Sequence, residues 1–315
     1  MSVPDSPLED RRFLFITGKG GVGKTSLAAA LAVAMAKRGK RVLVAMCGAH
    51  ERLSGMMGSP PIDHEIAAVA DGVWATRIDP SRAMEEYGEL VIKVKALARA
   101  VFDNKYTTTF FRAVPGLHDW AMLGKAWYHT TETLDDGRPR FDLVIFDAPS
   151  TGHGLDMLRV PKVILDIVPP GVLRRDAEAA WGLFKDPVRS GVVVVSLPEA
   201  LPTTESVELV STLRDELSLP VVKLVVNAVQ TPLFSAEEHD AFAARPELLE
   251  LAQGDAGEAG ERALSVAARR AAREQLQAAC IARLEAAVGL SAVRLPFLLE
   301  GAGTPEGTAT LAAAF

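Results

Sequence analysis

The chain has 315 residues, of which 49% are hydrophobic, and it carries a formal net charge of −6. A chain of this length can form two domains, but doubly wound α/β folds often use as many residues in one, and we predict a single domain over residues 1–315. The acidic balance argues against a surface that coats nucleic acid, so no nucleic-acid partner is expected.

The two cysteines, Cys47 and Cys280, are too few for a disulfide framework or a paired-cysteine metal clamp. This fits a reducing cytoplasm and predicts that there is no zinc site. The N-terminal residues are acidic rather than basic, which is unlike a signal peptide. The longest apolar run, residues 27–36, is far shorter than the roughly 20 residues of a membrane span. We therefore expect no transmembrane segment and a cytoplasmic location.

The first predicted elements surround a glycine-rich motif. Residues 13–26 read FLFITGKGGVGKTS and fit the pattern G-x-x-x-x-G-K-[ST], between an apolar run typical of a buried strand and residues at helical spacing. Glycines at a helix N-terminus allow backbone N–H groups to converge on phosphate oxygens. We expect Lys24 to reach the terminal phosphates and Thr25 to bind Mg²⁺. The nucleotide-binding residues predicted here are Gly18, Lys19, Gly20, Gly21, Val22, Gly23, Lys24, Thr25 and Ser26.

Apolar strands and helical segments then alternate along the chain. The further strands are predicted at residues 41–46, 73–78, 142–147, 192–195, 221–226 and 292–296. Strands that are apolar on both faces and separated by helices are typical of a doubly wound, mostly parallel sheet flanked by helices. The fold class predicted is therefore α/β.

Two helical insertions are predicted, at about residues 80–136 and 235–289. The first is a helical subdomain, and packing against the sheet is at least as good an explanation for it as binding a protein client. In the second, a strict four-residue step predicts one packed face of a long helix. The residues on this step are Leu264, Ala268, Ala272, Leu276, Cys280, Leu284 and Val288.

The strand at residues 142–147 ends in Asp147. Ligands of parallel sheets bind at the carboxyl ends of the strands, and a buried carboxylate without a cation is costly. We therefore predict that Asp147 takes part in catalysis by holding Mg²⁺, through water.

The loop GKGGVGKT resembles the deviant P-loop of the class that includes arsenite-pump, septum-site and chromosome-partition ATPases. In that class the additional lysine, here Lys19, reaches across a dimer interface to the partner's nucleotide. Further along, FDAPSTGHGLDMLRVP resembles the second switch of the arsenite-pump (ArsA) and tail-anchored-protein-targeting ATPases. The matching positions are Asp147, Thr151, Gly152, His153 and Leu155. The segment VPGLHDWAMLGKAWY is similar to bacterial paired homologues, the anion-transporting-ATPase-like branch.

The resemblance covers nearly the whole chain and implies a Mg-ATP-dependent, ATP-hydrolysing switch with a deviant Walker A loop. It implies bound ATP or ADP, catalytic roles for Lys19 and Lys24, and adenine contacts from Asn227, Pro296 and Phe297. It also implies a homodimer or a heterodimer with a paralogous ATPase, acting on an unknown protein client.

One departure from the family matters for hydrolysis. The first switch of the family reads D-P-A-H-N, whereas this chain has Cys47 followed by Gly-Ala-His-Glu. A thiol cannot replace the carboxylate that positions the attacking water. Glu51 could substitute for it, or it could be a solvated loop residue, and we expect slow hydrolysis. The alternative is a subunit that holds nucleotide but hydrolyses it poorly. A partition-type ATPase is the third possibility, but no basic amphipathic helix or basic patch supports it.

Overall fold

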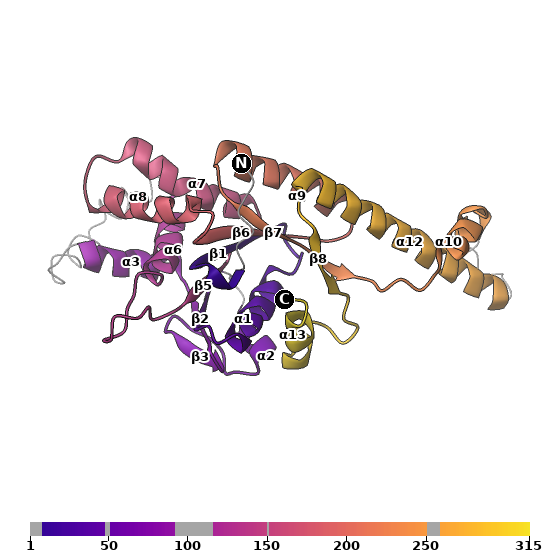
Figure 1. The fold of residues 1–315 in the computed structure, drawn as a ribbon, viewed down its shortest axis with the longest axis horizontal. Helices are drawn as coiled ribbons and strands as arrows, with labels where there is room; N and C mark the ends of the chain where they lie inside the picture. Colours follow the sequence, from indigo (N-terminus) through magenta and orange to yellow (C-terminus); the bar gives the residue numbers. More distant parts are fainter. Residues whose placement is uncertain (1–7, 48–50, 92–115, 150, 251–258) are drawn as a thin grey trace.

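The computed structural model describes residues 8–47, 51–91, 116–149, 151–250 and 259–315. An eight-stranded sheet with the order β3-β4-β2-β5-β1-β6-β7-β8 forms its centre (Figure 1). Neighbouring strands pair in parallel, except β3 with β4, so the predicted α/β class and mostly parallel sheet are confirmed. The strands are β1 Phe13–Thr17, β2 Val42–Met46, β3 Ala67–Ala70, β4 Val73–Arg77, β5 Leu143–Asp147, β6 Ser190–Ser196, β7 Val221–Val229 and β8 Ala292–Pro296.

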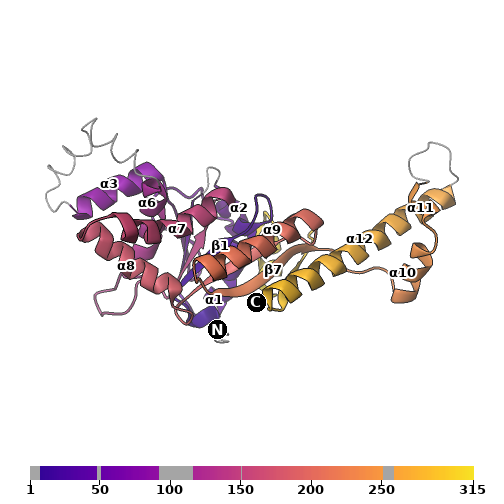
Figure 2. The same ribbon diagram turned by 90° about the horizontal axis from the view of Figure 1, so that it is seen from above.

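Helices cover both faces of the sheet. On one face lie α1 (Lys24–Lys37), α2 (Leu53–Met57) and α13 (Pro305–Ala312), and α1 packs against both of the others. On the other face lie α3 (Pro80–Val91), α6 (Leu117–Tyr128), α7 (Thr151–Ile167), α8 (Val172–Lys185) and α9 (Ala200–Ser211) (Figures 1 and 2). This layering explains why α1 is buried nearly all round: the sheet covers its inner side, and α2 and α13 cover its outer side.

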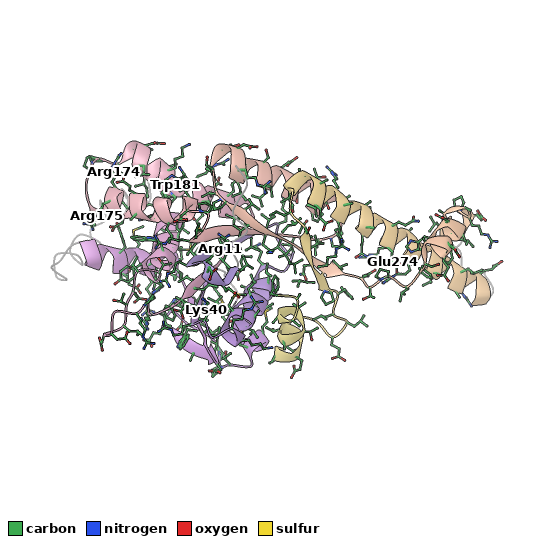
Figure 3. The ribbon with its side chains drawn as sticks, viewed as in Figure 1. Arg11, Lys40, Arg174, Arg175, Trp181 and Glu274 are labelled. Carbon is green, nitrogen blue, oxygen red and sulfur yellow. The ribbon has the colours of Figure 1, made fainter. Side chains whose placement is uncertain are left out.

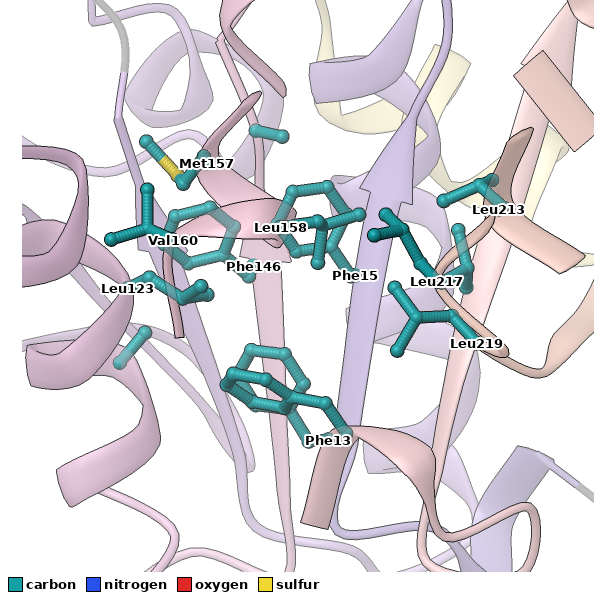
Figure 4. Close-up of a cluster of buried hydrophobic side chains, with 14 of the residues drawn as sticks. Phe13, Phe15, Leu123, Phe146, Met157, Leu158, Val160, Leu213, Leu217 and Leu219 are labelled. Carbon is teal, nitrogen blue, oxygen red and sulfur yellow. The ribbon is translucent and has the colours of Figure 1, made fainter. Parts of the chain in front are cut away.

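The sheet has a hydrophobic core on each face, and successive side chains of β1 point alternately into one and the other. Phe13 and Phe15 face the α6–α9 side, where Phe15 stacks on Phe146 of β5 with ring centroids 5.1 Å apart (Figure 4). Leu14 and Ile16 face α1. Because all of these side chains are buried, β1 is fixed from both faces. The loop that follows it therefore starts from a rigid support.

The second helical insertion forms an arm that extends away from the sheet (Figures 1 and 2). Its long helix is α12 (Ala259–Val288), against which α10 (Ala236–Ala243) and α11 (Glu247–Glu250) pack. The buried carboxylate of Glu274, labelled in Figure 3, connects α12 to α10 and to the loop before α10. It accepts hydrogen bonds from Arg270 Nε at 2.7 Å and Leu233 N at 3.0 Å, and its other oxygen lies 3.0 Å from His239 Nε2.

The prediction of one packed face along this helix is only partly right. Its buried members are Ala268, Cys280, Leu284 and Val288, whereas Leu264, Ala272 and Leu276 are exposed. A four-residue step overshoots one helical turn by about 40°, so a strict step winds around the helix instead of marking one face. Glu274 and Gln277 are buried instead, because backbone N–H groups at residues 230 and 233 donate to their side chains.

Other boundaries also differ from the prediction. The first insertion is not helical to residue 136, because α6 ends at Tyr128, where the hydroxyls of Thr130 and Thr131 donate to the carbonyls of Trp127 and Tyr128 at 2.7 Å. Strand β3 was not predicted, although Asp71-Gly72 is a typical hairpin turn and Gly72 has φ +70°. Helices α2, α7, α8 and α13 were not predicted either. Residues 92–115 of the first insertion lie outside the described residues.

Candidate nucleotide-binding site

The predicted phosphate-binding loop lies between the carboxyl end of β1 and the first residue of α1, Lys24. Two of its glycines are required by close packing. A Cβ on Gly18 would lie 2.2 Å from the carbonyl oxygen of Val195, and one on Gly23 would lie 2.2 Å from Asn227 Nδ2. Both glycines also have positive φ, +153° and +95°. The loop is thus held against the ends of β6 and β7 by contacts that only glycine allows.

Lys24 folds back over this loop. Its Nζ donates to the carbonyl oxygens of Gly18 and Lys19, both at 3.1 Å. Burial lowers the pKa of the Lys24 ammonium, and the charge of Asp147 opposes that shift. The ammonium is therefore placed among the backbone groups of the loop, where a phosphate oxygen can take the place of the carbonyls.

Thr25 and Asp147 come from different elements and meet beside the loop. The Thr25 hydroxyl donates to Asp147 Oδ2 at 2.7 Å, whereas Oδ1 is buried and has no hydrogen-bond partner among the described residues. Burial raises the pKa of Asp147 to about 6, against the lowering effects of the Thr25 hydrogen bond and the Lys24 charge. A hydroxyl and a carboxylate with an unpartnered oxygen are the ligand types that Mg²⁺ takes, directly or through water. These residues therefore fit the ion.

Lys19 contacts helix α9 of its own subunit. Its Nζ forms an ion pair with Glu205 of α9 at 2.6 Å, and the Lys19 side chain is 44% exposed. The two residues border a shallow cleft together with Leu155 of α7. Lys19 thus has a partner within its own subunit, because α9 presents a carboxylate opposite the loop. The reach across a dimer interface stays a prediction.

Cys47 directly follows β2, next to the strand that carries Asp147, and its N–H donates to the Asp147 carbonyl at 3.2 Å. The thiol has a pKa well above its ordinary value, raised by burial first and then by the charges of Asp147 and Asp119. It is therefore neutral at physiological pH. Asp119 lies in the first turn of α6. Its proximity to Cys47 could not be predicted from the sequence, because only the fold brings α6 near β2.

Glu51 is engaged where α2 begins. Its carboxylate accepts from Ser54 N at 2.8 Å and from the Ser54 hydroxyl. Both oxygens accept hydrogen bonds from the first turn of α2, as those of a capping side chain do. Glu51 lies in the loop before α2 and is partly exposed, so it remains a loop residue with a hydrogen-bonding role, and its catalytic role stays a prediction. Residues 48–50 between it and Cys47 lie outside the described residues.

The predicted adenine-binding residues lie at the same edge of the sheet. Asn227, near the end of β7, donates from Nδ2 to the carbonyl of Val22 at 2.9 Å, so it ties the P-loop to the sheet. Ala228 next to it has φ +55°, and the β7–β8 register shifts there. Pro296 ends β8, and Phe297 is 50% exposed with its N–H donating to Val229 O at 2.9 Å. An adenine contact from these residues stays a prediction.

The matched second-switch positions follow β5. Residues Thr151–His153 form the start of α7, and residue 150 lies outside the described residues. Since Asp147 ends β5 and α7 begins four residues later, this segment joins the buried carboxylate to a helix.

A parallel sheet with a glycine-rich loop, a buried lysine and a hydroxyl–carboxylate pair at one edge defines a P-loop nucleotide-binding protein. Residues 11–169, about half of the chain, match the family model described as anion-transporting ATPase. The chain belongs to this family, the ArsA ATPases, as the resemblance implied.

Several curated proteins of the family are similar to the chain. ATPase BagA of Mycobacterium tuberculosis is 30% identical over 231 residues, which are 70% of this chain and 66% of that protein. The putative arsenical pump-driving ATPase of Halobacterium salinarum is 32% identical over 241 residues, 70% of this chain and 36% of its own length. An arsenical pump-driving ATPase of Escherichia coli is 33% identical over 153 residues, 47% and 25%. The chain thus spans slightly under two thirds of the mycobacterial relative.

In the part of the chain that the structure describes, no helix combines the length and the apolar character needed to span a membrane. The described residues also contain no group of three or more histidine, cysteine, aspartate or glutamate side chains arranged to hold a metal ion. The two cysteines are free.

Proposed function

We propose that this protein is a Mg-ATP-binding ATPase that acts as a dimeric switch in the cytoplasm and hydrolyses ATP slowly by itself. The observation that carries the proposal is the Thr25–Asp147 pair, whose buried, unpartnered Oδ1 lies beside the lysine of the P-loop. Membership of the ATPase family supports it. The free thiols of Cys47 and Cys280 agree with a reducing compartment.

In this mechanism the loop residues Gly18–Ser26 bind the phosphates of ATP through backbone N–H groups and through Lys24. Thr25 and Asp147 hold Mg²⁺, which neutralises charge on the phosphate oxygens when it is bound. Asp147 must be ionised to do so, and Lys24 stabilises that ionised form. Without a bound cation, an ionised Asp147 would be a buried charge at the end of β5, which is costly.

The proposed dimer depends on Lys19. In the deviant P-loop class this lysine contacts the partner's nucleotide, and here its half-exposed side chain forms an ion pair with Glu205. ATP in a facing subunit would compete with Glu205 for the ammonium. The partner would be a second copy or a paralogous ATPase, and the closed dimer would present its helical subdomain to a protein client.

A second candidate function is a subunit that holds nucleotide for a more active partner. Cys47 favours it, because a neutral thiol stands where the family places the water-positioning aspartate. The Glu51 carboxylate already accepts hydrogen bonds from Ser54. Under this alternative the chain would contribute Lys19 to an active site that the paralogue completes.

Calorimetry of the purified chain with ATP tests the main proposal. We expect ATP to bind in the presence of Mg²⁺ and to bind more weakly when the ion is chelated, followed by slow single-turnover hydrolysis. Absence of ATP binding would refute the P-loop assignment. Binding without any hydrolysis, restored by a co-purified paralogue, would select the second candidate.

Light scattering with and without a non-hydrolysable ATP analogue tests the assembly. We expect the analogue to produce a dimer of the wild-type chain, alone or with a co-expressed paralogue. Lys19→Ala should retain ATP binding but lose this dimer. A wild-type chain that stays monomeric in every condition would contradict the switch while leaving nucleotide binding intact.

A further inference from the structure

The arm formed by α10, α11 and α12 carries a basic face that the nucleotide site does not use. Arg262, Val266, Arg269 and Arg273 follow one another on α12 at steps of four, three and four residues. At about 100° per residue, these steps keep the four positions within about 60° of one another around the helix. All four side chains are exposed, Val266 by 66%. They therefore form a continuous strip, about 16 Å long, which we call the basic face.

The arginines of the basic face have few partners within the described part of the chain. Arg262 has no side-chain partner there. Arg269 donates to the carbonyl oxygen of Leu249 at 3.3 Å, and Arg273 lies 4.0 Å from Glu199 with 62% of its side chain exposed. The strip is opposite in sign to the chain as a whole, which carries a net charge of −6. An acidic surface is therefore the partner that its charge favours.

The same arm also presents an acidic face, on α10. Glu237 and Asp240 are exposed, lie about 60° apart around this helix, and have no side-chain partner among the described residues. His239 lies on the inner side of α10, where its Nε2 is 3.0 Å from Glu274 of α12. Glu237 is about 160° around the helix from His239, so it points away from α12. These two carboxylates therefore do not pair with the basic face of their own arm and are accessible to another chain.

The position of the arm allows a second copy of the chain to reach both faces. The arm extends away from the sheet, so two arms can lie side by side without contact between the two sheets (Figures 1 and 2). Around a two-fold axis, the basic face of each copy would meet the acidic face of the other, so that the pairing is made twice. Val266, within the basic face, would add an apolar contact.

From this complementarity we propose that the arm is an interface between two copies of the chain, in which α12 of each copy binds α10 of the other. The interface is separate from the P-loop edge of the sheet and needs no nucleotide. It consists mainly of exposed charges over a small area, so the association is weak and sensitive to salt. It does not depend on the ATPase function proposed above.

Sedimentation velocity of the nucleotide-free chain tests this interface. We expect the wild type to self-associate reversibly at low ionic strength. The association constant should fall about tenfold or more when NaCl is raised from about 20 to about 500 mM, because salt screens exposed charges.

Two variants each reverse the charge of one face. Arg262→Glu/Arg269→Glu makes the basic face acidic, and Glu237→Arg/Asp240→Arg makes the acidic face basic. Each variant alone should fail to associate, because its two faces then carry the same sign. An equimolar mixture of the two should associate again, since every pairing is then between opposite charges. Association of the mixture also shows that both variants are folded.

Arg138→Glu/Arg175→Glu is the matched control, with the same change in net charge. Its two arginine side chains are 70% and 74% exposed and lie outside the arm, Arg175 at the opposite end of the molecule (Figure 3). This control should associate like the wild type. A wild type that is monomeric at low salt, a control as impaired as Arg262→Glu/Arg269→Glu, or a mixture that stays monomeric would each overturn the proposal. Self-association retained by Glu237→Arg/Asp240→Arg alone would also overturn it, because the basic face would then bind a different acidic surface.

Discussion

The two halves of the nucleotide site differ in how completely they are assembled. On the phosphate side, Lys24 donates to two carbonyls of the loop, Thr25 donates to the buried carboxylate of Asp147, and the loop itself contacts β6 and β7. On the side of the attacking water, Cys47 is a neutral thiol and Glu51 caps a helix. Under the proposed function, binding and hydrolysis would rest on different residues of this chain. The comparison therefore predicts that each can be changed without the other.

The largest effect is expected from Cys47→Asp. A carboxylate at this position can orient the attacking water, and such groups contribute about 10²–10⁴-fold to rate. We expect single-turnover ATP hydrolysis to rise by about 10²-fold or more, with ATP affinity nearly unchanged. Cys47→Asn is the matched control, since it has the same shape without the charge. Fast hydrolysis by the wild type would show that another residue already positions the water.

The second prediction concerns the pH dependence of stability without nucleotide. Asp147 has a pKa of about 6 in the folded chain, raised mainly by burial from an ordinary 3.8. A raised carboxyl pKa means that the folded state holds its proton more tightly, so stability is lost as pH rises from about 4 to about 6. The loss is on the order of 2–3 kcal/mol.

Asp147→Asn should remove this loss. In denaturant melts the variant should be more stable than the wild type at pH 7.5, and the difference should fade below about pH 4. With Mg-ADP the order should reverse, because only the ionised carboxylate supports the cation. A wild-type stability that rises between pH 4 and 6 beyond that of the variant would contradict the buried, unpartnered Oδ1.

How much of this site the sequence predicts depends on the range of each contact. Local patterns predict the P-loop, the sheet and the position of Asp147 at a strand end. Strand–loop–helix order and apolar alternation depend on residues that are neighbours in the sequence. The pairs Lys19–Glu205 and Asn227–Val22 join residues far apart in the chain. The position of Asp119 near Cys47 likewise depends on how α6 packs. No local pattern specifies such contacts.

The arm shows the same limit for the fold. Its helix could be predicted from periodicity, but the buried side of α12 is decided by what covers it. Glu274 and Gln277 are buried because residues 230–239 bring hydrogen-bonding groups to them, which periodic apolar spacing cannot indicate. Leu264 and Leu276, which the periodic spacing placed on the packed face, are exposed.

The third prediction tests the phosphate side alone. Lys24→Ala should remove a charge-assisted contact of roughly 1.5–3 kcal/mol and weaken ATP binding by about one to two decades. Lys37→Ala is the control, because Lys37 is the exposed last residue of the same helix. Calorimetry gives both affinities. If Lys24→Ala bound ATP as tightly as Lys37→Ala, the phosphate side would not lie at this loop.

The smallest expected effect concerns the ion pair between Lys19 and Glu205, which belongs to neither half. Its Nζ–Oε1 distance is 2.6 Å, but the side chains are 44% and 24% exposed, so solvent screens the pair. Such pairs contribute about 0.2–1 kcal/mol. If Glu205 holds Lys19 away from a partner's nucleotide, Glu205→Gln should strengthen ATP-dependent dimer formation about two- to fivefold. ATP affinity of the monomer should not change.

Glu208→Gln on the same helix is the control, since the Glu208 side chain is exposed. Sedimentation over a range of protein concentrations measures the association. Weaker association of Glu205→Gln than of Glu208→Gln would mean that Glu205 positions Lys19 for the partner rather than competing with it.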